Sequence, residues 1–195
     1  MDERLIDSAP TSSDTARARS EPANRLAVLV LALILLPTYL WTGAALDDLG
    51  IYDQYNILYD ADPNTRLPCF AEGWGDGRSL VHPNLCNLIN PVIRIIAAPF
   101  EITGLVAGES LRRQLALAVA PLFAVASIGV LLLILRRVGC RMSIAFPIAL
   151  LYGFSFSQWL FGSMPDHFAL GGFSLAVAFW LLVDSVQRRR LGIWR

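Results

Sequence analysis

Long apolar stretches dominate the pattern of this chain. A helix needs about 20 apolar residues to cross the hydrocarbon core of a bilayer, and four stretches approach or exceed that length. They are Leu26–Leu46, Leu115–Leu135, Ile144–Phe161 and Met164–Val183. Only the fourth carries an Asp or a His, and both Asp166 and His167 stand near its beginning. The pattern therefore predicts an all-α fold, a multi-pass bundle of about four transmembrane helices.

Composition supports a membrane protein. Hydrophobic residues make up 55% of the chain and charged residues only 16%, and the formal net charge is zero. Soluble domains carry roughly 25% charged residues. This composition argues against an ordinary soluble domain, a disordered chain and a nucleic-acid-binding protein.

The first apolar stretch has one alternative interpretation, a cleaved signal peptide. The small residues Thr42–Ala45 at its end are compatible with cleavage. However, signal peptides have an apolar region of roughly 7–15 residues, and Leu26–Leu46 is longer and follows a polar segment. We therefore expect a transmembrane helix.

Arginine sets the expected orientation, because cytoplasmic loops carry an excess of positive charge. With four spans, three Arg-bearing segments fall on one side: residues 1–25, which we expect to be a disordered tail, the turn with Arg136, Arg137 and Arg141, and the tail 184–195. Both termini are then cytoplasmic. The loop Asp47–Gln114, with nine acidic residues and five Arg, is exoplasmic. We expect an integral protein of a bacterial inner membrane.

The loop between the first two spans is long enough to carry a function, since unstructured loops beyond about 12–15 residues are uncommon. Its apolar segment 84–102 predicts a helix lying in the membrane interface. A fifth, broken span is the alternative, and it would invert the orientation of everything that follows. Cys69 and Cys86 share this loop, where an oxidising compartment allows a disulfide. Two unpaired buried thiols are the alternative, and Cys140 is expected to be free.

Acidic and basic residues follow a recognisable order in the loop. Asp60 and Asp62 come soon after the first span, and His82-Pro83 follows and opens the apolar segment. Later, Pro165-Asp166-His167 begins the fourth span. This arrangement resembles the GT-C glycosyltransferases, integral-membrane enzymes such as the protein O-mannosyltransferases that use polyprenyl- or dolichyl-phosphate sugars. Such enzymes have more spans, so the resemblance implies that this chain corresponds to their N-terminal part.

The resemblance implies transfer of a sugar from a polyprenyl-phosphate donor to an exoplasmic acceptor. That chemistry needs a base for the acceptor and cationic partners for the leaving phosphate. The expected catalytic residues are Asp60 and Asp62, with Asp53 as the next choice. The expected substrate-binding residues are Arg66, Trp74, Arg78, His82, Asp166 and His167.

Plainer interpretations remain for the same residues. Asp62-Pro63-Asn64 is also a typical solvated turn, and the loop cations can simply be solvated. Two neighbouring acids could hold Mg²⁺, although no third ligand follows at a suitable spacing. The partners we expect are membrane lipid and the lipid-linked sugar donor. The alternative function is a non-catalytic scaffold or accessory protein whose loop binds a partner membrane subunit.

Overall fold

The structure is a computed structural model, and it describes residues 12–53, 63–73, 83–104 and 107–187. Within these ranges the chain is helical and contains no strand. The helices are α1 (Ser12–Asp48), the short 3-10 helix η1 (Ile51–Asp53), α2 (Pro63–Glu72), α3 (Pro83–Ile102), α4 (Gly108–Arg137), α5 (Met142–Gly153), α6 (Phe156–Ser163) and α7 (Phe168–Gln187). The all-α prediction is confirmed for this part of the chain.

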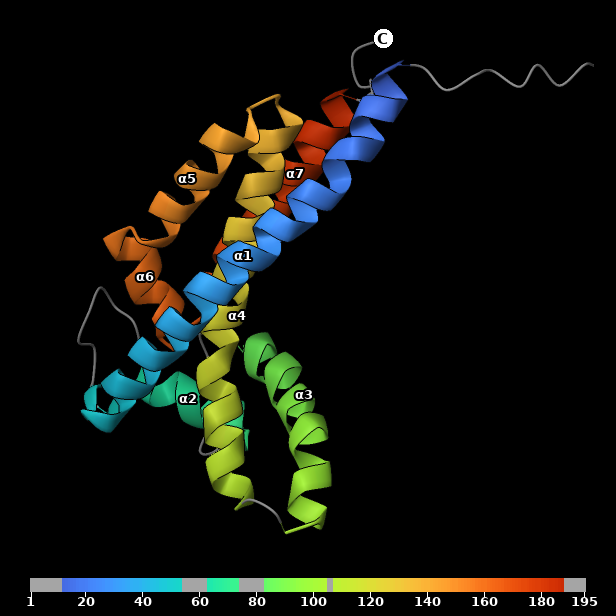
Figure 1. Cartoon of the computed structure of the whole chain (residues 1–195). Helices are drawn as coiled ribbons and strands as arrows, with labels where there is room; N and C mark the ends of the chain where they lie inside the picture. Colours follow the sequence, from blue (N-terminus) through green and yellow to red (C-terminus); the bar gives the residue numbers. More distant parts are fainter. Residues whose placement is uncertain (1–11, 54–62, 74–82, 105–106, 188–195) are drawn as a thin grey trace, which may run out of the picture.

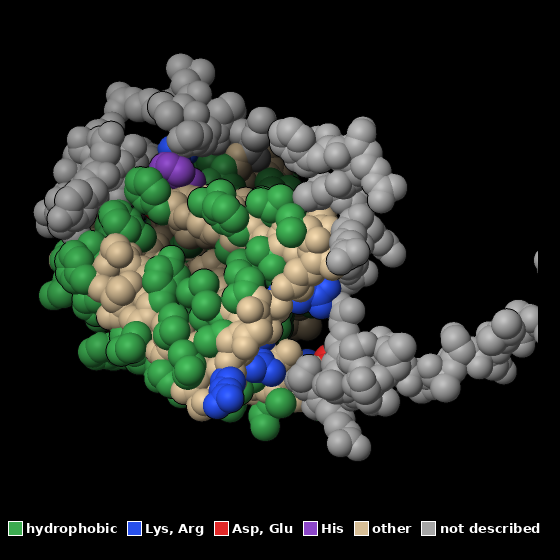
Figure 2. All heavy atoms as spheres, turned by 90° about the horizontal axis from the view of Figure 1, so that it is seen from above, with side chains coloured by type: hydrophobic (Ala, Val, Ile, Leu, Met, Phe, Trp, Pro, Cys, Tyr) green, Lys and Arg blue, Asp and Glu red, His purple; other side chains and the backbone are tan. Residues whose placement is uncertain are grey.

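Four described helices are long and apolar enough to cross a membrane, within Glu21–Asp48, Leu85–Ile102, Gly108–Arg137 and Phe168–Gln187. A fifth span is formed if α5 and α6, which are bent by 59°, count as one. Hydrophobic side chains cover most of the described surface seen in Figure 2, with few charged ones between them. The chain is therefore a multi-pass membrane protein by the length and composition of its helices.

Three of the expected elements differ in the structure. The segment Ile144–Phe161 is not one straight helix, because the chain leaves the helix at Phe154 and Ser155 and resumes it in a new direction. The helix of the fourth predicted span is α7, which begins at Phe168, after a connector that contains Pro165. α1 already begins at Ser12, so the chain is helical over much of the tail for which composition predicts disorder. The expected helix at 84–102 exists as α3, whereas its interfacial position stays a prediction.

α4 is the central helix (Figure 1). α1 and α7 lie along it, α5 and α6 pack beside them, and α2 and α3 lie against its first half. The core divides accordingly. One cluster joins α1, α4 and α5 around Leu35, Ile128 and Ala149. The other joins η1, α2, α3 and α4 around Tyr52, Phe70 and similar residues. We call the part of the bundle that holds α2 and α3 the loop end.

The opposite end gathers the predicted cytoplasmic segments. Arg136 Nε donates to Asn24 Oδ1 at 3.0 Å. Arg137 pairs with Asp184, and the Gln187 amide donates to the carbonyl oxygen of Arg137 at 2.5 Å. These contacts bring the start of α1, the α4–α5 turn and the end of α7 together, as Figure 1 shows. The positive-inside argument requires these three segments to lie at the same end of the bundle. The assignment of this end to the cytoplasm stays a prediction.

The bend between α5 and α6 is held by a hydrogen bond and by close packing at glycines. The Tyr39 hydroxyl of α1 donates to the carbonyl oxygen of Gly153, which ends α5, at 2.5 Å. This satisfies a backbone acceptor that the break would otherwise leave without a partner in the membrane. In α6, a Cβ on Gly162 would lie 2.8 Å from the Ala124 Cβ and 2.9 Å from the Tyr39 ring. Glycine is therefore what allows α6 to approach α4 and α1.

This packing yields a stability prediction. We expect Gly162→Val to destabilise the protein by about 1–3 kcal/mol, because the added carbons overlap α4 and α1. Gly171→Val on α7 is the matched control, since no atom lies within 4 Å of a Cβ there. Its effect should stay within about 0.5 kcal/mol. Unfolding in mixed detergent micelles, followed by tryptophan fluorescence, measures both. Equal effects of the two variants would contradict the packing described here.

Candidate polar site at the loop end

The connector between α6 and α7 carries two of the predicted site residues, Asp166 and His167. Met164 and Asp166 are buried, with 0% and 3% of their surface exposed. The backbone N–H of Asp166 donates to the carbonyl oxygen of Met164 at 2.8 Å, so the connector is a tight turn. Non-helical backbone inside a membrane protein is tolerated only where protein surrounds it or a cavity adjoins it. The sequence thus places a carboxylate in a packed turn at the start of α7.

Arg66 reaches this carboxylate from α2, which is distant in the sequence. Its Nε lies 3.9 Å from Asp166 Oδ1, and the two side chains are only 5% and 1% exposed. Removing two charges from water costs several kcal/mol per ion, and close pairing offsets that cost. The structure therefore joins Arg66 and Asp166 into a buried ion pair between the loop and the fourth predicted span.

His167 extends the pair toward the surface. Its Nδ1 lies 2.5 Å from Asp166 Oδ1, and its backbone N–H donates to the same oxygen at 2.5 Å. The imidazole is about one-third exposed and stacks against Phe168 with ring centres 4.4 Å apart. When Nδ1 carries the proton toward the carboxylate, Nε2 of the neutral ring is a proton acceptor.

Two residues of the N-terminal part hold the connector from the other side. The Tyr52 hydroxyl donates to the carbonyl oxygen of Ser163 at 2.9 Å. Burial raises the pKa of Tyr52, and the neighbouring charge of Asp47 raises it further, so the hydroxyl stays a donor. A Cβ on Gly43 would lie 2.8 Å from the same Ser163 oxygen, which only glycine avoids. η1 and α1 therefore fix the position of the turn that bears Asp166.

α2, which supplies Arg66, is a ten-residue helix, too short to be stable alone in water. Tertiary links to α3 hold it. Cys69 and Cys86 form a disulfide with Cα atoms 5.7 Å apart. The Asn90 amide donates to the carbonyl oxygen of Phe70 at 3.0 Å, and Arg94 donates to that of Glu72 at 2.6 Å. Of the two alternatives that the sequence leaves open for Cys69 and Cys86, the structure has the disulfide, and Cys140 is free as expected.

Asp53 belongs to a different cluster. Arg113 of α4 donates two hydrogen bonds to Asp47, at 2.5 and 3.0 Å, and its Nη2 lies 3.8 Å from Asp53 Oδ1. The Asp53 side chain is 73% exposed. This second ion pair ties the end of α1 to the start of α4. Asp53 thus lies beside Arg113, whereas Asp166 pairs with Arg66.

The remaining predicted residues, Asp60, Asp62, Trp74, Arg78 and His82, lie outside the described residues. Of the predicted set, the structure thus brings together Arg66, Asp166 and His167. Among the described residues, no group of three or more His, Cys, Asp or Glu side chains could hold a metal ion. The magnesium prediction on Asp60 and Asp62 stays a prediction.

Sequence reasoning missed the supporting residues. Tyr52 and Gly43 act through the Ser163 carbonyl, far along the chain. Arg113 was not singled out, although it binds Asp47. The sequence does show a glycine and an aromatic residue near the end of the first span. It does not indicate that both contact the backbone at Ser163.

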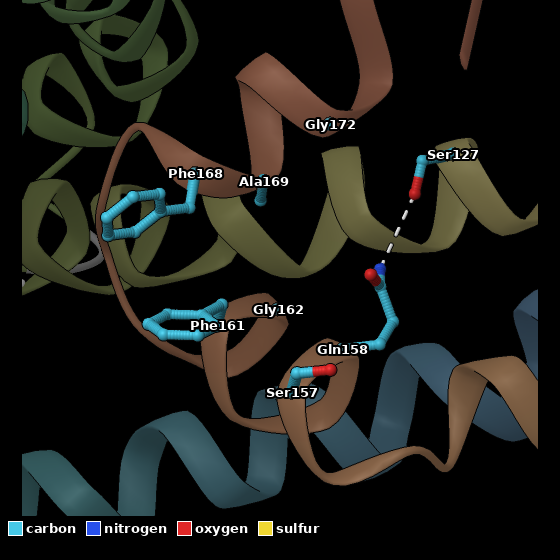
Figure 3. A pocket seen from close by; sticks show the side chains of 8 residues that line it. All are labelled: Ser127, Ser157, Gln158, Phe161, Gly162, Phe168, Ala169 and Gly172. Atoms are coloured by element: carbon cyan, nitrogen blue, oxygen red, sulfur yellow. Dashed lines mark hydrogen bonds between the residues drawn. The ribbon is translucent and has the colours of Figure 1, made fainter. Parts of the chain in front are cut away.

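A cavity lies next to the start of α7 (Figure 3). It lies between α4, α6 and α7, has a volume of about 150 Å³, and continues into an open apolar hollow of about 360 Å³. Its lining residues are Ser127, Ser157, Gln158, Phe161, Gly162, Phe168, Ala169 and Gly172, with Phe156 at the outer hollow. The Gln158 amide lies 3.4 Å from the Ser127 hydroxyl. The cavity is therefore lined by polar side chains at Ser127 and Gln158 and by phenylalanine rings at the outer hollow.

Comparison with known proteins adds no assignment: no family model, no curated protein and no solved structure matches the chain.

Proposed function

We propose that this chain is a membrane glycosyltransferase, or the N-terminal part of one, acting on a polyprenyl-phosphate sugar. The observation that supports the proposal is the convergence of Arg66, Asp166 and His167, three residues expected from the sequence to bind the substrate. Buried charged and ionisable groups at a membrane boundary are costly and commonly mark functional sites. Their position beside a cavity between helices suits a substrate that arrives through the membrane.

Each residue has a role in the proposed reaction. A carboxylate of Asp60 or Asp62 accepts the proton of the acceptor hydroxyl. The acceptor oxygen forms a bond to the anomeric carbon, the bond from that carbon to the phosphate oxygen breaks, and polyprenyl phosphate leaves. Protonated His167, oriented by Asp166, and the guanidinium of Arg66 stabilise the negative charge on the leaving phosphate.

The proposed orientation puts this chemistry on the exoplasmic side. The Arg-rich end faces the cytoplasm by the positive-inside rule, so the loop end is exoplasmic. α4 has 30 residues and is about 45 Å long at 1.5 Å per residue, whereas the hydrocarbon core is about 30 Å thick. Its first turns, with α2 and α3, then extend into the interface. The exposed apolar side of α3, with Leu88, Val92, Ile95 and Phe100, contacts lipid there.

One observation favours the second candidate, a non-catalytic scaffold. The pairs Arg66–Asp166 and Arg113–Asp47 tie the loop to the spans, which also suits a rigid platform for a partner subunit. On this alternative the cluster is structural, and the protein neither binds nor turns over a lipid-linked sugar. The two candidates therefore differ in a measurable activity.

The deciding experiment is a transfer assay with the full chain in lipid nanodiscs. Donors are polyprenyl phosphates carrying labelled mannose, glucose or galactose, offered with a hydroxyl-bearing peptide. We expect release of label from one donor and a loss of at least about tenfold for His167→Gln, because a general acid–base or charge-stabilising group is removed. Glu101→Gln, in a separate pair with Arg112, is the control and should keep full activity. No transfer and no donor binding by the intact protein would favour the scaffold.

A further inference from the structure

Arg66 and Cys69 lie about one helical turn apart on α2, and each links this helix to a different part of the molecule. Arg66 reaches Asp166 in the connector between α6 and α7. Cys69 is bonded to Cys86 of α3, with Cα atoms 5.7 Å apart. The helix also lies against α4 (Figure 1). Residues three apart are neighbours on a helix surface, so the ion pair and the disulfide hold the same short stretch of α2.

The end of α2 is held by α3 as well. The Asn90 amide donates to the carbonyl oxygen of Phe70, and Arg94 donates to that of Glu72. Both oxygens belong to the last turn of α2, where helix carbonyls have no partner within the helix. Because a ten-residue helix is marginal in water by itself, its attachment to α3 determines where α2, and with it Arg66, lies.

The sulfur atoms of the disulfide are closed off from solvent. Cys69 is 6% exposed and Cys86 is 0% exposed, and both belong to the buried cluster of the loop end. An oxidant or a reductant must reach a sulfur atom in order to exchange with it. Either reaction therefore requires α2 to move away locally from its neighbours. Such an opening separates Arg66 from Asp166, because Arg66 is only one turn from Cys69.

We infer that the disulfide and the ion pair act as one coupled clamp on α2, and that oxidation of Cys69 and Cys86 is the step that completes the polar site. The order follows from burial. The thiols react while α2 is still undocked, and docking then brings Arg66 to Asp166 and closes the disulfide off from solvent. The two cysteines are thus positioning residues for Arg66. The inference concerns the assembly of the site and holds for whichever reaction the site performs.

The oxidation needs a partner that carries a disulfide. The thiolate of one cysteine attacks a sulfur atom of the partner and forms a mixed disulfide, and the second cysteine then displaces the partner. Cys69 and Cys86 together give up two electrons and two protons, which the partner takes up as it becomes a dithiol. With the loop end on the exoplasmic side, as in the proposed orientation, this partner is a thiol oxidase of an oxidising compartment.

Reduction of the folded protein measures the coupling, because linkage is reciprocal: if the disulfide places Arg66, the ion pair protects the disulfide. The full chain with Cys140→Ser, in phosphatidylcholine nanodiscs, is treated with dithiothreitol. Free thiols are trapped with a maleimide that shifts the band on a gel. We expect Arg66→Gln to be reduced at least about tenfold faster than the parent protein, which corresponds to about 1.4 kcal/mol of interaction lost from the closed state.

Arg113→Gln is the matched control. It breaks the ion pair with Asp47, which ties α1 to α4 and stays intact when α2 opens. Its reduction rate should stay within about twofold of the parent's, as expected for independent sites. If the buried charge of Asp166 prevents Arg66→Gln from folding, the combination of Arg66→Gln with Asp166→Asn replaces it. That variant leaves two neutral side chains and should show the same acceleration.

A second measurement addresses the effect of oxidation on the site. In mixed micelles, Arg66→Gln should raise the unfolding equilibrium constant at least about fivefold more in the oxidised protein than in a Cys69→Ser, Cys86→Ser background, within the range of coupling between residues of one network. Equal effects in the two backgrounds would overturn the inference. So would equal reduction rates for the Arg66 and Arg113 variants, or reduction of the parent as fast as that of a solvent-exposed disulfide.

Discussion

Replacing Arg66 with alanine is expected to destabilise the protein by about 3–5 kcal/mol, the usual cost of removing one member of a buried ion pair. Asp166 is only 3% exposed, so its charge could not be solvated by water. The measurement is unfolding in mixed micelles, followed by tryptophan fluorescence. The effect should be the largest among single substitutions at the loop end.

Arg113→Ala is the matched control, because it breaks the ion pair with Asp47 while the Arg113 side chain is 42% exposed. Solvent screens exposed pairs, so we expect a cost of about 0–1 kcal/mol. Adding Asp166→Asn to Arg66→Ala should recover part of the lost stability, since it removes the buried charge. Similar costs for Arg66→Ala and Arg113→Ala would contradict the burial of the Arg66–Asp166 pair.

Replacing Asp60 or Asp62 with asparagine is expected to reduce sugar transfer by about 10²–10⁴-fold, the usual loss when a general base is removed. Asparagine keeps the shape of the side chain and removes its basicity, so membrane insertion should be unchanged. The measurement is the initial rate with the donor that the intact protein prefers. Donor binding should change little, because the base acts on the acceptor.

Asp53→Asn distinguishes between the candidate bases. Asp53 lies beside Arg113 rather than beside Arg66, so its substitution should leave the transfer rate within about threefold, an effect below 1 kcal/mol on the barrier. Full activity of both the Asp60 and Asp62 variants, combined with a large loss for Asp53→Asn, would move the base to Asp53.

Hydrophobic patterning predicted most of the fold because membrane helices need long apolar runs. The spans Leu26–Leu46 and Leu115–Leu135 lie within α1 and α4. The break at Phe154 and Ser155 was not predictable in the same way. Both residues lie in an apolar run, and the contacts found at the bend, the Tyr39 hydrogen bond and the close approach at Gly162, are tertiary.

The site was predictable only as separate residues. Arg66 was chosen as a cation in the loop and Asp166-His167 as ionisable residues at the start of a span, each for its own reason. Their proximity depends on α2, which the disulfide and the Asn90 hydrogen bond attach to α3, and on the turn held by Tyr52. Sequence spacing carries no information about such contacts, because each one joins segments that only the packing around α4 brings together.

The central claim is that the polar site at the loop end stands on the exoplasmic side of a membrane, and single-cysteine labelling tests it most directly. The free Cys140 is replaced by serine, and the Cys69–Cys86 disulfide is kept. One probe cysteine replaces Leu49, which is 71% exposed at the end of α1, and another replaces Arg141 in the α4–α5 turn. We predict that a membrane-impermeant maleimide labels Leu49→Cys in intact cells and labels Arg141→Cys only after the membrane is opened. The reverse pattern would place the site in the cytoplasm and contradict the account.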